Sequence, residues 1–202
     1  MRTHAILLAT ALSIAGCSTV GPAPDEVFYR LPSSDTRHGE TKLPGVLPGV
    51  LPGVLLIDTW QAGDLHGSLQ MLYSEDLAGI SLQQYHYDLW ADRPTKLIAD
   101  FAQSWLSQRG IADAVLPESS GAVGQWRLSG EVRRLEQLNG GDVPAVVVGV
   151  DLRLTDLLNR DATPRGGYFE ARKSIASADP MNAVSGYREA LNAILEDFVA
   201  GL

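Results

Sequence analysis

Two long runs of alternating apolar and polar residues flank a glycine-rich turn, and they constrain the fold more than any other feature. The first run, residues 125–138, alternates apolar with charged side chains: Trp126, Leu128 and Val132 against Arg127, Glu131 and Arg133. After the turn Asn139-Gly140-Gly141-Asp142, residues 145–154 return as AVVVGVDLRL. Alternation is typical of half-buried strands, and Asn-Gly favours the tight turn of a β-hairpin. The sequence therefore predicts an antiparallel hairpin here.

Two amphipathic segments each begin at a proline just after an acidic residue. The first segment begins at Asp92-Arg93-Pro94 and ends at Gly110. Its apolar stripe consists of Leu97, Ile98, Phe101, Ala102, Trp105 and Leu106. Asp179-Pro180 opens the second, with the stripe Val184, Tyr187, Leu191, Ile194, Leu195 and Phe198. Proline suits the first turn of a helix, acidic side chains are stabilised near its positive end, and glycine favours its termination. Both segments are predicted to be helices with one buried face.

Further strand-like runs occur before, between and after these elements: 28–31, 54–60, 68–74, 80–90, 114–116 and 168–177. The order along the chain is strands, helix, strands, helix. This order predicts an α+β fold, with a mostly antiparallel sheet and two amphipathic helices packed on one face. A chain of 202 residues is too short for two full domains. We therefore expect a single domain over residues 28–202.

The N-terminus has the pattern of a secretory signal. Arg2 precedes the apolar stretch Ala5 to Ala15, and Ile14-Ala15-Gly16-Cys17 resembles the bacterial lipoprotein box. A helix over that stretch rises about 16 Å, too short to span a bilayer. Cys17 is the only cysteine of the chain. We expect residues 1–16 to be a lipoprotein signal peptide and Cys17 to be the lipid attachment site.

Two segments rich in proline and glycine show no apolar period. Residues 17–27 are expected to be the acylated cysteine and its tether, and Ser18 in place of Asp favours sorting to the outer membrane. Residues 43–54 repeat LPGV three times. Because proline removes a backbone donor from each copy, we expect neither a helix nor a central strand there. A surface loop that took up a short duplication is the favoured interpretation, and an elastic or ligand-like segment is the alternative.

The side chains give little support for catalysis. The sequence has no nucleophile elbow, no zinc-protease motif and no phosphate-binding loop. Asp64 with His66, and His86 with Asp88, have a spacing that puts both members on one strand face, but such pairs arise often by chance. We therefore predict no catalytic residue, no metal site and no cofactor. The 16 basic against 24 acidic residues also argue against nucleic acid as a partner.

The stretch from Tyr85 to Trp90 is rich in aromatic residues. Tyr85 and Tyr87 share one strand face, and Trp90 comes just before the first predicted helix. Tyr and Trp are the usual anchors of protein interfaces, so Tyr85, Tyr87 and Trp90 are candidates for binding a partner. The alternative is that they pack beneath the helix.

Three motifs downstream of the lipoprotein box resemble a known family. They are FYRLPS at 28–33, YHYDLWADRP at 85–94 and LIADFAQSWL at 97–106. Their order and spacing are similar to the ABC-type transport auxiliary lipoproteins, the PqiC-like group, over about residues 28–200. The LPGV repeat departs from the family pattern.

The resemblance implies a non-catalytic lipoprotein of the outer membrane that faces the periplasm. Its implied partners are an MCE-domain protein and the permease and ATPase of an ABC-type lipid transport system that maintains the envelope. Only Cys17 carries over as a functional position. The competing hypothesis is a periplasmic lipoprotein that holds an acyl chain in its own apolar cleft. A dry cavity of several hundred Å³ lined by Leu and Phe would favour it, whereas a sealed core between sheet and helices would favour the transport subunit. The sequence does not indicate the oligomeric state.

Overall fold

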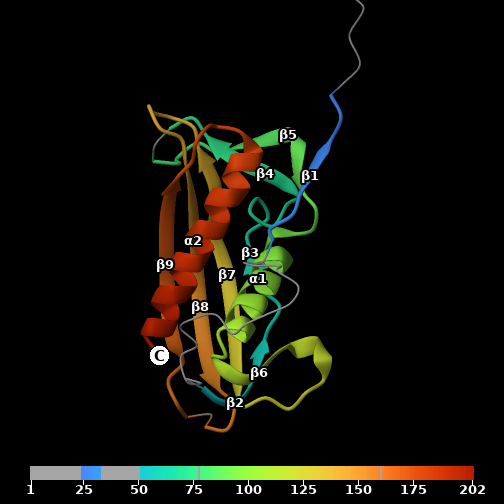
Figure 1. The fold of residues 1–202 in the computed structure, drawn as a ribbon, viewed down its shortest axis with the longest axis vertical. Coiled ribbons are helices and arrows are strands. Elements are labelled where there is room, and N and C mark those ends of the chain that lie inside the picture. The colour runs from blue at the N-terminus through green and yellow to red at the C-terminus, as the bar shows by residue number, and fades with distance from the viewer. Residues whose placement is uncertain (1–23, 33–50, 77, 160) are drawn as a thin grey trace, which may run out of the picture.

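The longest strand, β7 (Trp126–Leu138), organises a nine-stranded sheet in the computed structural model (Figure 1). On one side it pairs with β8 (Ala145–Asp156) over their full length, as the predicted hairpin requires. Its other side is shared by three shorter strands: β2 (Leu51–Ile57), β3 (Gln61–Ala62) and β4 (Gln70–Ser74). The structure describes residues 24–32, 51–76, 78–159 and 161–202. The predictions for the signal peptide at 1–16, for Cys17, for the tether up to residue 23 and for residues 43–50 lie outside these ranges.

Four more strands extend the sheet on both sides of this centre. They are β1 (Val27–Tyr29), β5 (Gln83–Trp90), β6 (Ala112–Pro117) and β9 (Arg165–Ser174). β9 adds to β8 and has no second neighbour among the described strands, so it is an edge. β6 lies beside β2, while β5 and then β1 lie beyond β4.

The sheet is mixed, which corrects the expectation of a mostly antiparallel one. Among the described strands, five pairings are parallel and three are antiparallel. The parallel pairs join segments far apart in the sequence, such as β2 with β7. Parallel neighbours require long crossover connections, and the alternation within one strand does not record the direction of a distant neighbour.

Both predicted helices are confirmed, as α1 (Pro94–Gln108) and α2 (Pro180–Ala200). In Figure 1 they lie on the same side of the sheet. The Asp179 side chain caps α2 by accepting a hydrogen bond from the Met181 backbone N–H. Gly186 lets this helix approach the sheet closely, because a Cβ there would come within 2.8 Å of the Val146 side chain.

The last copy of the LPGV repeat is part of a strand, which corrects the expectation of a loop through residue 54. β2 begins at Leu51 and tolerates Pro52 because the register with β6 shifts between Leu51 and Val54. Pairing with β7 starts only at Leu55, so the proline lies where β2 has a single neighbour. Gly53 has a φ of 86°, a conformation that favours glycine.

Candidate functional site

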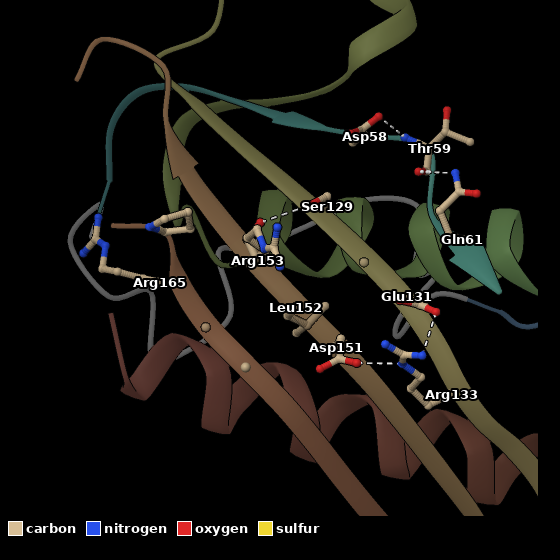
Figure 2. Close-up of a pocket in the computed structure, with 14 residues that line it drawn as sticks. Asp58, Thr59, Gln61, Ser129, Glu131, Arg133, Asp151, Leu152, Arg153 and Arg165 are labelled. Atoms are coloured by element: carbon tan, nitrogen blue, oxygen red, sulfur yellow. Dashed lines mark hydrogen bonds and ion pairs between the residues drawn. The ribbon is translucent and has the colours of Figure 1, made fainter. Parts of the chain in front are cut away.

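A broad groove of about 760 Å³ lies on the face of the sheet away from the helices (Figure 2). Its floor is formed by outward side chains of β7 and β8: Ser129, Glu131, Arg133, Asp151 and Arg153. The chain between β2 and β3 contributes Asp58, Thr59 and Gln61, and the start of β9 contributes Arg165, Gly166 and Gly167. Strand alternation thus places a polar surface on the side opposite the core.

The charges on the groove floor are mostly paired and half-exposed. Arg133 bridges two carboxylates, with Nη1 2.9 Å from Glu131 Oε1 and Nε 2.7 Å from Asp151 Oδ2 (Figure 2). Arg153 is exposed and has no carboxylate partner in the described part of the chain. Exposed ion pairs stabilise a fold by at most about 1 kcal/mol, and this geometry activates no nucleophile. The groove is suited to contact with a polar, charged surface.

A buried ionic cluster lies further along β7. Because Leu135 points into the core, Arg134 and Glu136 point to the opposite face. Glu136 is 2 % exposed, and its two oxygens lie 3.0 Å from His66 Nε2 and 3.0 Å from Arg134 Nη2. Burial alone would raise the pKa of Glu136, but the hydrogen bonds with His66 and Arg134 outweigh burial and lower it.

The cluster continues to the edge strand and is closed by a turn. Arg134 Nη1 lies 3.5 Å from Glu170 on β9, and the Tyr168 hydroxyl donates a hydrogen bond to the same carboxylate. Burial and that hydrogen bond raise the pKa of Tyr168 to about 12. On the other side, Gly79 packs so tightly that a Cβ would lie 2.5 Å from Arg134 Nη2. This packing and the paired charges indicate a structural role.

The structure separates the three aromatic residues that the sequence offers for partner binding. Trp90 is 2 % exposed and packs against Tyr187 of α2, with ring centroids 5.5 Å apart, so it belongs to the core. Tyr85 is half-buried, and its ring centroid lies 4.5 Å from that of Tyr73. Tyr87 is 39 % exposed. Of the three, Tyr87 is the most exposed, and partner binding there stays a prediction.

The His/Asp spacings of the sequence do not bring their members together. His66 contacts Glu136 instead of Asp64, and Asp88 accepts a hydrogen bond from the Tyr29 hydroxyl at 2.9 Å. Burial, then the hydrogen bond to Asp88, raises the pKa of Tyr29 to about 12. Within the described ranges, no three His, Cys, Asp or Glu residues are grouped as metal ligands would be. None of the helices in those ranges has the length and hydropathy needed to cross a bilayer.

The space between the sheet and the helices is filled by side chains. Phe101 and Trp105 of α1 join Tyr187 and Phe198 of α2 in one continuous core cluster. A cleft of about 260 Å³ opens beside α1, and its lining includes charged residues: Asp58, Lys96, Asp100 and Glu118. Sites for small ligands usually measure about 300–1,000 Å³, so this cleft is smaller than a typical site. This arrangement favours the sealed core over a cleft for an acyl chain.

The family model described as "ABC-type transport auxiliary lipoprotein component" matches residues 68–199. The chain belongs to this family. The match confirms the resemblance carried by the motifs near α1, and it includes β4 to β9 together with both helices. Membership makes the chain a transport-associated auxiliary lipoprotein. A search of curated protein sequences finds no significant match.

Two solved structures share the fold. The crystal structure of protein XCC0632 from Xanthomonas campestris has 18 % sequence identity and a TM-score of 0.67, over 86 % of this chain and 92 % of that one. The crystal structure of an uncharacterized protein has 13 % identity and a TM-score of 0.66, over 88 % of this chain and 98 % of that one. At these identities the likeness concerns the fold alone.

The sequence reasoning missed the groove and the ionic cluster. Glu136 sits in an ordinary alternating pattern, and only the fold shows that His66 and the turn at Gly79 cover it. The charged positions of the hairpin, such as Glu131 and Arg133, indicated a polar outer face of the sheet, which forms the groove floor. No local signal indicated that the chain near Asp58 and the start of β9 would form its walls.

Proposed function

We propose that this chain is a non-catalytic, outer-membrane lipoprotein subunit of an MCE/ABC-type lipid transport system that maintains the envelope. The observation that carries the proposal is the family match over residues 68–199. Cys17 anchors the chain through its acyl groups, and the folded domain faces the periplasm. There it holds an MCE-domain protein, which works with a permease and an ATPase.

The groove and the adjoining edge strand form the contact surface that suits such a partner best. The groove presents half-exposed charges and the exposed Arg153, which has no carboxylate partner among the described residues, and charge complementarity directs protein association. β9 borders the groove and has β8 as its one neighbour among the described strands, so its other edge can pair with a strand of another chain. Tyr87 is the second candidate contact, on β5.

Capture from membranes tests the proposal. The tagged, acylated chain is purified from gently solubilised membranes, and an MCE-domain protein is expected to co-purify. Arg153→Glu reverses the free charge of the groove and should reduce this recovery severalfold, and Tyr87→Asp tests the second contact. Glu189→Lys is the matched control, because Glu189 is an exposed residue of α2, on the helix side of the sheet.

Two results would contradict the proposal. If no envelope transport component is recovered, under conditions that preserve other envelope complexes, the assignment of an MCE-domain partner is wrong. Equal recovery with Arg153→Glu and with Glu189→Lys removes the groove as the contact surface and leaves Tyr87 and the β9 edge.

A further inference from the structure

Several exposed apolar side chains lie toward the end of the molecule at which β1 begins. Five belong to the first strand, to two turns and to the start of α2: Val27 (45 % exposed), Phe28 (57 %), Ile80 (87 %), Val143 (57 %) and Met181 (70 %). We call these five residues the apolar end. In Figure 1, these segments all lie toward the upper end of the molecule, with the start of β1 on the right, the β4–β5 and β7–β8 turns on the left and the first turn of α2 between them.

Hydrogen bonds hold the two turns and the chain before α2 in place, whereas β1 is held separately by its pairing with β5. The Asn139 N–H donates to the Ser74 carbonyl, and the Ile175 N–H donates to the Pro144 carbonyl, which ties the two turns to the approach to α2. Asp76 fixes the turn that carries Ile80 by accepting hydrogen bonds from the backbone N–H groups of Ile80 and Ser81. The exposed side chains are therefore carried by ordered backbone.

The length of the tether favours a membrane as the surface that the apolar end faces. Cys17 precedes Val27 by ten residues, and ten extended residues span at most about 36 Å. β8 alone, with 12 residues, is about 40 Å long, and it runs from the turn with Val143 to the opposite end. If the end opposite Val143 faced the bilayer, the tether would have to stretch along the whole sheet. We therefore expect the apolar end to lie next to the bilayer.

The charge around the apolar end decides what kind of lipid surface it fits. Acidic residues surround it: Asp25, Glu26, Glu75, Asp142 and Asp179 are all exposed. Such a surface is repelled by anionic lipids. A neutral, zwitterionic bilayer has no such repulsion, and it gains from burial of the apolar side chains in its interface.

We propose that the apolar end inserts into the interface of a zwitterionic bilayer and fixes the orientation of the anchored domain. This proposal rests on the proposed function, because it requires the lipid anchor at Cys17. Its consequence is that the opposite end of the sheet, with the turn after β8, points away from the membrane. The groove wall at the start of β9 then lies far from the bilayer surface.

Nitroxide labels on the acylated full chain test the proposal in vesicles. Cys17 is the only cysteine, and acylation blocks its thiol, so Ile80→Cys and Val143→Cys each supply one free thiol. The matched controls are Leu158→Cys and Val123→Cys, at positions 76 % and 86 % exposed in other turns. In phosphatidylcholine vesicles, collisions with oxygen and with a polar nickel reagent measure whether each label is in lipid or in water.

Labels at positions 80 and 143 should collide more with oxygen than with nickel, and labels at 158 and 123 should show the reverse. Adding phosphatidylglycerol should weaken the difference. Water-exposed labels at all four sites would overturn the inference while leaving the anchor intact, as would labels at 80 and 143 shielded from both reagents by a protein. A mass spectrum without acyl chains would instead overturn the anchor, and the inference with it.

Discussion

Gly130 shows how one missing side chain shapes the core. The ring of Trp60, which is 3 % exposed, lies directly over it, and a Cβ at position 130 would come within 2.4 Å of that ring. On β8, Gly149 lies beneath Tyr168 in the same way, so that a Cβ there would contact the tyrosine side chain, which is 50 % exposed. The two glycines differ because the exposed tyrosine can move aside, whereas the buried tryptophan cannot.

Gly130→Ala should therefore lower the free energy of unfolding by about 1–3 kcal/mol, the usual cost of overpacking. Urea denaturation followed by fluorescence measures this change. Gly63→Ala is the control, because nothing lies within 4 Å of a Cβ there. Equal losses in the two variants would show that Trp60 does not pack against Gly130.

Glu136 makes stability depend on pH. Its pKa is lowered in the fold, so its contribution is present above the ordinary value of 4.5 and is lost as the pH falls through the folded value. Glu136→Gln should cost about 1–3 kcal/mol at pH 7, because Arg134 and His66 lose a charged partner.

Denaturation curves at several pH values check this expectation. The gap between the native chain and Glu136→Gln should shrink as the pH falls below 4.5. The exposed Glu189→Gln should leave stability nearly unchanged at every pH. A gap that stays constant through the acidic range would assign the loss to packing instead of charge.

At the scale of elements, α1 depends on Trp105. This side chain is 1 % exposed, and the Arg109 guanidinium lies 3.9 Å from its ring centroid. Trp105→Ala should lower the free energy of unfolding by about 3–5 kcal/mol because it leaves a large cavity. Gln108→Ala, at an exposed position of the same helix, should change it by less than about 0.5 kcal/mol. Similar effects in both variants, measured by thermal unfolding, would mean that the buried face is assigned wrongly.

The elements that the sequence predicted are those with local signals. The proline starts and apolar stripes predicted α1 and α2, and the Asn-Gly turn predicted the pairing of β7 with β8. β3 has only two residues and no local pattern, so it was missed. Trp90 stood next to the helix start, and only the fold shows that it packs against Tyr187. Local chemistry thus predicted the elements, but not which distant elements meet.

At the scale of the whole molecule, we predict that Cys17 anchors the chain. Cys17→Ser removes the thiol that would carry the lipid, so we expect an uncleaved or mislocalised precursor. Detergent partition and intact mass measure this, with Ser18→Ala as the control that keeps the thiol. A cleaved and fully functional Cys17→Ser protein without acyl chains would contradict the anchor.

The shared side of β7 also has a consequence for how the chain folds while it is being synthesised. β2, β3 and β4 come first, yet each pairs with residues between Trp126 and Leu138. Until that segment arrives, three strands have open edges at once, and loop closure over such distances is slow. The first half of the nascent chain is therefore the part most exposed to aggregation until β7 is complete.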